Sequence, residues 1–208
     1  MANVGDDVKP RRRYRSDRRR EQAAQTRERI LDAAARLFEE RGYEGAAVTA
    51  IAAEAGVSPE TVYARFDNKR TLLGALVQRV VRGDDPAPVP EQAGHRAVAA
   101  AADPREQLRL FAADIVRRLE RVGPIIAVVD EGRGNRELAE LYERLHAERR
   151  RNLGHLVAAL GIESDDAVET VWALASPELH RLLTRTGGWT RERYRDWLSE
   201  SLAALLLR

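Results

Sequence analysis

The chain has 208 residues, of which 33% are charged, 5% are aromatic and none is cysteine, and its net charge is +2. This length allows one small and one medium-sized domain, and the lack of cysteine excludes disulfides and thiolate metal sites. Alanine, leucine, arginine and glutamate dominate and no run approaches the roughly 18 apolar residues of a membrane span, so we expect an all-α cytoplasmic protein of about nine helices.

The first 20 residues are strongly basic and hold few apolar residues. Lys9 and seven arginines oppose three aspartates there, a net charge of +5, which leaves −3 for the rest of the chain. We expect residues 1–23 to be a disordered basic arm. The arm is either a solubilising leader or a DNA contact, and in the second case Arg18, Arg19 and Arg20 are the candidates because they adjoin the first helix.

Two short helices joined by a tight turn are predicted within residues 47–66, after a helix over 26–41. Thr49 can cap the first of the two, and Gly56 follows where a helix ends with positive φ. Ser58 then caps the second, with Pro59 at its first position.

Val62 and Phe66 lie four residues apart and turn this second helix inward, so that its polar side chains face outward. Such a pair is a helix-turn-helix, whose second helix enters the DNA major groove. A further helix over 69–82 completes a predicted DNA-binding domain at residues 24–84.

Several segments match a known family in order and spacing: RILDAAARLF (29–38), GY (42–43), VTAIA (48–52), AGVS (55–58), TVYARF (61–66) and NK (68–69). Through them, residues 24–84 resemble the tetracycline-repressor (TetR) family of bacterial transcriptional regulators. Residues 103–208 are similar to a common regulatory domain of that family, through WALASPELHRLL (172–183) and GWTRERY (188–194).

Residues 85–102 are expected to be a linker, because prolines and glycine interrupt helix at its start. Helices are then predicted from Asp103 to about residue 121, over 135–160, over 164–185 with a kink at Pro177, and over 190–207. Between the first two, Gly123 and Pro124 are expected to break the helix, with a short apolar helix reaching residue 129.

The outward residues of the second motif helix are the candidates for base contacts. Thr61 can donate or accept a hydrogen bond, and Ala64 can pack on a thymine methyl. Glu60 either accepts from cytosine or only favours the helix dipole, and Arg65 reaches guanine or, as we prefer near the helix end, phosphate. The resemblance implies further DNA contacts by Tyr63, Lys69 and Thr49; packing is the alternative for Tyr63, and capping for Lys69. With Ser58 and the arm, the candidate set is Thr49, Ser58, Glu60, Thr61, Tyr63, Ala64, Arg65, Lys69, Arg18, Arg19 and Arg20.

Residues 103–185 are expected to enclose a ligand cavity between helices, and the last two helices to offer a dimer surface. The family resemblance implies how both would work. A small molecule bound there would change the spacing of the two recognition helices, and two helices from each protomer would form a four-helix bundle. The ligand candidates, each also a candidate for ordinary core, are Phe111, Ile115, Ile126, Val129, Tyr142, Leu145, His146 and Trp172. The dimer candidates, which can also be intramolecular core, are Val168, Trp172, Leu179, Leu183, Tyr194, Trp197, Leu198 and Leu202.

Residues 148–151 (ERRR) are interpreted as a solvated helix face, and the four histidines as isolated. Neither a nucleophile–base pair nor metal-ligand spacing appears in the sequence, so we expect no enzyme, cofactor or metal. The first hypothesis is a homodimeric repressor released from a palindromic operator by a small molecule. The second is a structural protein that binds DNA with little sequence preference through its arginine-rich arm.

Overall fold

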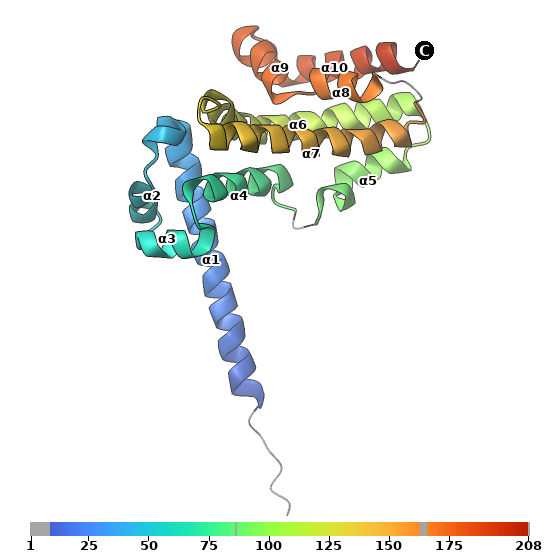
Figure 1. Cartoon of the computed structure of the whole chain (residues 1–208). Coiled ribbons are helices and arrows are strands. Elements are labelled where there is room, and N and C mark those ends of the chain that lie inside the picture. The colour runs from blue at the N-terminus through green and yellow to red at the C-terminus, as the bar shows by residue number, and fades with distance from the viewer. Residues whose placement is uncertain (1–8, 86, 163–165, 208) are drawn as a thin grey trace, which may run out of the picture. The chain divides into compact units, whose positions relative to one another are not determined.

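The computed structural model describes residues 9–85, 87–162 and 166–207, and every regular element in these ranges is helical, as the all-α prediction requires (Figure 1). The chain forms two compact units, one up to Leu73 and one from Gly74 onward. This division falls inside helix α4 (Lys69–Arg82), whereas the sequence placed the domain boundary after residue 84. In the described ranges, no helix is long and apolar enough to cross a membrane.

The first unit contains α1 (Lys9–Gly45), α2 (Val48–Glu54), α3 (Pro59–Phe66) and the start of α4. Apolar residues on the facing sides of these helices are fully buried, among them Ile30, Leu31, Phe38, Ile51 and Leu72. Helix α1 bends at Gly42, whose φ of 66° and ψ of −180° are open to glycine and strained for other residues, and the bend lies at the end of the first predicted helix.

Helix α1 begins at Lys9, so residues 9–23 are helical and the expectation of disorder is wrong for them. The reason is intrinsic propensity, because arginine, glutamine, glutamate and alanine dominate residues 11–25 and all of them favour helix. High charge and low hydrophobicity prevent burial, but they do not prevent the extension of a helix that is already nucleated by a packed segment. Residues 1–8 of the expected arm lie outside the described residues.

The turn between α2 and α3 closes with a Schellman pair of hydrogen bonds. The N–H of Val57 donates to the carbonyl of Ala52 at 3.0 Å, and the N–H of Gly56 donates to that of Ala53 at 3.1 Å. Gly56 has a φ of 64°, as predicted. Thr49, however, does not cap α2, because the helix starts two residues earlier than such a cap requires, with Ala47 as its N-cap and no side-chain cap bond.

Replacing Gly56 with alanine is expected to destabilise the first unit by about 1–2 kcal/mol, because a side chain at positive φ brings Cβ close to the following carbonyl. Space does not limit this substitution, since the nearest atom to an added Cβ is Arg29 Nη1 at 3.7 Å. Urea unfolding followed by circular dichroism measures the effect. Gly154→Ala is the control: it lies inside helix α7 with nothing within 4 Å of an added Cβ, and should be neutral or stabilising. Equal midpoints for the two variants would contradict the prediction.

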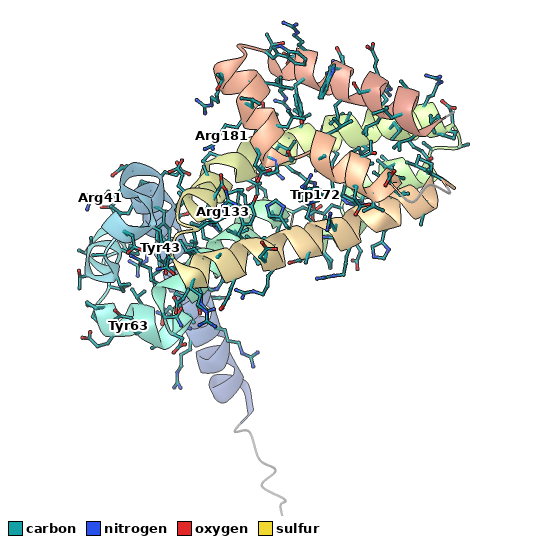
Figure 2. The ribbon with its side chains drawn as sticks, turned by 45° about the horizontal axis from the view of Figure 1, so that its top comes forward. Arg41, Tyr43, Tyr63, Arg133, Trp172 and Arg181 are labelled. Carbon is teal, nitrogen blue, oxygen red and sulfur yellow. The ribbon has the colours of Figure 1, made fainter. Side chains whose placement is uncertain are left out.

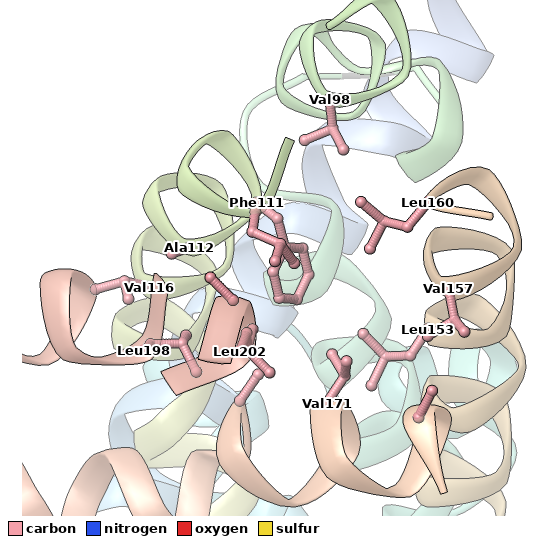
Figure 3. Close-up of a cluster of buried hydrophobic side chains, with 14 of the residues drawn as sticks. Val98, Phe111, Ala112, Val116, Leu153, Val157, Leu160, Val171, Leu198 and Leu202 are labelled. Atoms are coloured by element: carbon pink, nitrogen blue, oxygen red, sulfur yellow. The ribbon is translucent and has the colours of Figure 1, made fainter. Parts of the chain in front are cut away.

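The second unit contains the 3₁₀ turn Val89–Glu91 and helices α5 (Ala93–Ala100), α6 (Pro104–Glu131), α7 (Arg136–Ala159), α8 (Ala167–Leu174), α9 (Pro177–Arg181) and α10 (Arg191–Leu206), with a π turn at Leu182–Thr186. Helices α6 and α7 run side by side, and α8, α9 and α10 cover one side of this pair (Figure 1). The apolar faces of α6, α7, α8 and α10 meet in one core, which includes Phe111, Val116, Leu153, Val171 and Leu198 (Figure 3).

Four predicted helix starts in this unit are confirmed by their caps. Side chains of Asp103, Asn135, Ser176 and Thr190 each accept a hydrogen bond from a backbone N–H in the first turn of the helix that follows. The kink predicted at Pro177 is a full interruption of the helix: α8 ends before Ser176, which caps α9, and α9 begins at Pro177.

Gly123 and Pro124 do not break α6, which runs through both. A proline inside a helix costs about 3 kcal/mol through its missing N–H and the clash of its ring with the preceding turn. In α6 this cost is offset by the residues that follow, since Ile125, Ile126 and Val129 are buried and each buried side chain of this kind contributes about 1.5–3 kcal/mol. Tertiary packing therefore overrides the local signal.

A buried glutamine holds the expected linker at 85–102 in place through hydrogen bonds. Gln92 is 5% exposed, and its Nε2 donates to the carbonyls of Arg82 at 2.9 Å and Ala87 at 3.1 Å. Its Oε1 accepts from Arg118 Nη2 at 2.7 Å, and Arg118 Nε donates to Asp114 Oδ2 at 2.8 Å. These bonds attach the segment after α4 to α6 and satisfy a guanidinium that is 9% exposed.

Candidate functional site

Helix α3 presents a polar face. Val62 and Phe66 are 2% and 4% exposed and point into the first unit. Glu60, Ala64 and Arg65 are exposed, Thr61 is partly exposed, and Tyr63 is 51% exposed, the ring being labelled in Figure 2. The inward and outward sets are therefore those that the sequence predicted, and the exposed set can meet another molecule.

The start of α3 is held by the side chain of Ser58. Its Oγ accepts the N–H of Thr61 at 3.3 Å and lies 3.2 Å from Thr61 Oγ1. Hydrogen bonds from its own backbone N–H and from Ser58 lower the pKa of Glu60. Both acidic and hydroxyl side chains thus stabilise the helix N-terminus, which supports the structural interpretation of Glu60. Contact with cytosine stays a prediction.

A tight γ-turn ends α3 and orients α4. Asp67 has a φ of 63° and a ψ of −55°, and the N–H of Asn68 donates to the carbonyl of Phe66 at 2.6 Å. Asn68 Oδ1 then accepts the N–H of Thr71 at 2.8 Å and so caps α4. A non-glycine residue at this φ is strained, and such strain is found where a segment must be held in one direction.

Lys69, the first residue of α4, contacts the end of α1. Its Nζ lies 4.4 Å from the centroid of the Tyr43 ring and 3.4 Å from the carbonyl oxygen of Glu44. Desolvation lowers the pKa of this ammonium group. The sequence did not pair Lys69 with Tyr43, because the two residues are far apart in the chain and packing alone brings them together.

Two arginines of α1 brace the motif and were missed by the sequence analysis. Arg27 Cζ lies 5.6 Å from the centroid of the Phe66 ring, and Arg36 Nη2 pairs with Glu54 Oε1 at 2.9 Å. They connect α1 with α3 and with α2 respectively. Of the remaining predicted DNA contacts, Thr49 is exposed on α2, and Arg18, Arg19 and Arg20 are exposed on α1.

The predicted ligand residues of the second unit separate into two sets. Phe111, Ile126 and Val129 are buried, with Val129 at 0% exposure, and Ile115 and Leu145 are partly buried. The structure brings three others together. The ring centroids of Tyr142 and His146 are 4.1 Å apart, and those of His146 and Trp172 are 5.4 Å apart. Trp172 is labelled in Figure 2.

Arg149 joins this aromatic group, so its assignment to a solvated helix face is wrong. Its Nη2 donates to the carbonyl of Trp172 at 2.5 Å, and burial lowers its pKa to about 10. The missed signal is spacing, because Tyr142, His146, Arg149 and Leu153 recur at three- and four-residue intervals on one face of α7. Arg150 and Arg151, by contrast, are exposed.

Glu178 of α9 carries the negative charge of the group. Burial raises its pKa, but hydrogen bonds from His146 and from its own backbone, with the charges of His146 and Arg149, lower the pKa to about 2. His146 Nε2 is 3.5 Å from Glu178 Oε1, and the Tyr142 hydroxyl donates to the same oxygen at 3.4 Å.

Stability is therefore expected to depend on Glu178 at acidic pH. The pKa is about 2 in the folded state and roughly 4.3 in an unfolded chain, so the unfolded state binds the proton more readily. The contribution is fully present above the unfolded pKa and is lost as the pH falls through the folded one. Urea midpoints measured between about pH 5 and pH 2 should fall less steeply for Glu178→Gln than for the original protein. Equal slopes of urea midpoint against pH for Glu178→Gln and the original protein would contradict a stabilising role for the Glu178 carboxylate. Glu143→Gln, an exposed acid on α7, is the matched control.

The predicted dimer residues also separate by burial. Tyr194, Leu198 and Leu202 have 0% exposure in the single chain, and the Tyr194 hydroxyl donates to the carbonyl of Leu174 at 2.7 Å. These three are intramolecular core. The five that keep exposed surface are Val168, Trp172, Leu179, Leu183 and Trp197. Leu182 and Leu205, at 56% and 48% exposure, were not predicted.

Where the structure describes the chain, no group of three or more histidine, aspartate or glutamate side chains could hold a metal ion. The described features are a short polar helix on a packed three-helix base and, separately, an aromatic and cationic group in the second unit. The first can enter a groove of nucleic acid, and the second can hold a small molecule.

Comparisons with known proteins support the first of these roles. Residues 30–76 match the profile described as bacterial regulatory proteins, tetR family. The HTH-type transcriptional regulator UidR of Escherichia coli (strain K12) is 38% identical over 61 residues, which cover 29% of this chain and 31% of UidR. The HTH-type transcriptional repressor BepR of Brucella suis is 32% identical over 126 residues, or 54% of this chain and 60% of BepR. The chain thus spans less than two thirds of the length of these curated relatives.

Solved structures extend the likeness in fold to the second unit. The crystal structure of NalD, the secondary repressor of the MexAB-OprM multidrug efflux pump in Pseudomonas aeruginosa, superposes with a TM-score of 0.67 at 22% identity. That alignment covers 88% of this chain and 98% of NalD. The regulator FadR of fatty acid degradation from Bacillus halodurans gives a TM-score of 0.64 at 19% identity, over 85% of this chain and 93% of FadR.

Proposed function

We propose, because the chain belongs to the TetR family of bacterial regulatory proteins, that it binds a palindromic operator as a homodimer and represses transcription until a small molecule releases it. The family is one of transcriptional regulators and not of enzymes, in agreement with the sequence analysis. Acting on an operator implies that the protein works in the cytoplasm.

The outward face of α3 is the observation that carries the proposal. A helix of eight residues, anchored by Val62 and Phe66, leaves Thr61 partly exposed and Ala64 exposed toward base edges, with Arg65 placed for phosphate or guanine. Tyr63 beside them, together with Lys69, is assigned to the phosphates. Because Lys69 is held by Tyr43, it would present one charge in a fixed place rather than on a freely rotating stem.

A single α3 contacts too few base pairs for useful selectivity, which is why we propose a dimer. Two copies on one side of the duplex would read half-sites about 34–36 Å apart. The partly exposed apolar residues of α8–α10 support a dimer surface, and Leu182 and Leu205 join Trp172, Leu179 and Trp197 in it. A four-helix bundle at this surface is the arrangement that the family resemblance implies.

Release by a ligand requires that the ligand bind one state of the dimer more tightly than the other. The second unit supports this role through the group of Tyr142, His146 and Trp172, which combines aromatic rings with polar atoms. The buried candidates Phe111, Ile126 and Val129 would support the core around it.

A gel-shift assay tests the proposal, using a palindromic DNA from upstream of the protein's own gene or its neighbours and a scrambled duplex of equal length. The expected result is a sequence-dependent band with two protomers per duplex. Equal affinity for both duplexes would refute the proposal and favour the alternative, a structural protein that coats DNA.

The basic arm gives a second measurement that separates these two functions. Removing residues 1–20 takes away eight basic side chains, with Arg18, Arg19 and Arg20 among them. For an operator-binding protein we expect a smaller slope of log affinity against log salt, by several units, with sequence preference retained. For a coating protein the deletion should abolish binding altogether.

A further inference from the structure

We propose that the meeting point of α7, α8 and α9 is a binding site for a small aromatic carboxylate, with Arg149 and Trp172 donating hydrogen bonds to its oxygens. The inference deepens the proposed function and rests on it, because the bound acid would be the molecule that controls operator binding. We call the residues concerned the acid site: Tyr142, His146, Arg149, Trp172 and Glu178.

The first support is a set of buried donors without acceptors. Among the described residues, Arg149 Nε, Arg149 Nη1 and Trp172 Nε1 are buried and have no hydrogen-bond partner. Guanidinium and indole nitrogens can only donate. Because buried donors are nearly always paired in folded proteins, these three require oxygens from outside the chain.

The second support is charge. Arg149 stays cationic at neutral pH although burial lowers its pKa to about 10. Glu178 is the acid whose charge acts most on Arg149, but its Oε1 is already engaged by Tyr142 at 3.4 Å and His146 at 3.5 Å. The carboxylate therefore leaves the Nε and Nη1 of Arg149 unpaired, and an added anion would find a guanidinium that is only partly compensated.

The third support is the lining. His146 lies 4.1 Å from Tyr142 and 5.4 Å from Trp172 between ring centroids, so the three rings form one group, and Arg149 Cζ lies 5.8 Å from the Trp172 centroid. A ligand with an aromatic body can pack against such rings while its acid group reaches the nitrogens. A cation would face Arg149, and an alcohol or amide would bring fewer acceptor lone pairs to three donors.

The site has an approach from solvent. The Glu178 side chain is 35% exposed and that of His146 is 12% exposed. Arg150, with Cζ 4.7 Å from the Trp172 centroid and a side chain that is 48% exposed, covers the indole from the outside. A movement of Arg150 and Glu178, both at the surface, would open the acid site without unfolding a helix.

Water is the competing occupant, since buried water also pairs orphaned donors. The two differ in what they predict. Bound water would leave the protein indifferent to carboxylates, whereas the acid site should discriminate a carboxylate from a neutral molecule of the same shape.

The experiment uses the full chain and measures binding directly, by isothermal titration calorimetry and thermal shift, with benzoate, phenylacetate and indole-3-acetate. Benzamide is the neutral counterpart of benzoate. We expect saturable binding and a raised melting temperature for at least one acid, and neither for benzamide. Arg149→Met should weaken acid binding at least tenfold, and Trp172→Phe, which keeps a smaller aromatic ring and loses the indole N–H, severalfold. Arg151→Met, an exposed neighbour on α7, should bind as the original protein does.

The acid site is refuted if none of the three acids binds, if benzamide binds equally, or if Arg149→Met and Trp172→Phe bind like the original. Should Arg149→Met fail to fold, Trp172→Phe decides. Gel shifts with and without each acid are run in parallel. Operator binding that no acid affects would overturn the effector role, while acid binding by a protein that ignores the operator would leave the site standing and remove the proposed function.

Discussion

Replacing Phe66 with alanine is expected to destabilise the first unit by about 3–5 kcal/mol and to abolish operator binding. The ring is 4% exposed, ends α3 on its inner side and lies under the guanidinium of Arg27 at 5.6 Å. With Val62, it is one of two side chains that anchor the helix. Its removal leaves a cavity beneath a helix too short to be stable alone.

Hydrogen exchange of α1–α3 amides measures this effect within the first unit. Protection should fall in Phe66→Ala and stay unchanged in Tyr63→Ala, because Tyr63 is 51% exposed and surface substitutions usually change stability by less than about 0.5 kcal/mol. Both variants should bind operator poorly, for different reasons. Native protection in Phe66→Ala, or a loss of protection in Tyr63→Ala, would contradict the division of α3 into an anchor and an exposed face.

Substitutions on the outward face should fall into two classes when binding is compared across operator variants. Tyr63→Phe and Lys69→Met are expected to weaken binding to all sequences alike, because phosphate contacts carry no base information. Thr61→Val and Ala64→Ser are expected to change which base is preferred, by about 1–3 kcal/mol at one position, or roughly 5- to 150-fold in affinity.

A library of duplexes, each differing at one base pair, provides the measurement. Glu60→Gln is measured with the same library. A change only in helix stability supports a role for Glu60 at the helix N-terminus, and a new preference at a cytosine supports base contact. If all four substitutions gave the same profile, the assignment of Tyr63 and Lys69 to phosphate and of Thr61 and Ala64 to bases would be wrong.

Local chemistry made much of this fold predictable. Gly56 with positive φ, Ser58 as a cap, Ser176 before Pro177 and Thr190 before the last helix all lie where the sequence indicated. These features depend on one residue and its immediate neighbours, so that spacing alone reveals them.

The predictions that the structure does not bear out have a different origin, which is packing between distant segments of the chain. Pro124 continues a helix because the residues after it are buried, and Arg149 turns inward because its α7 face meets Trp172 and Glu178. Tyr194, for which the sequence left core and dimer surface open, is fully buried within the single chain for the same reason. The helix at residues 9–23 is the opposite case, where intrinsic propensity prevailed over a composition that favours disorder.

The division of labour within α3 has a consequence for how such a regulator can change. Its two anchors, Val62 and Phe66, are separate from the outward positions, and the flanking turns at Gly56 and Asp67 rely on backbone geometry. The side chains at the outward positions of α3 can therefore be exchanged as a set without disturbing its anchors. Grafting those of a relative onto this frame should retarget the protein to another promoter at little cost in folding, a route by which duplicated copies could diverge in the genes they govern.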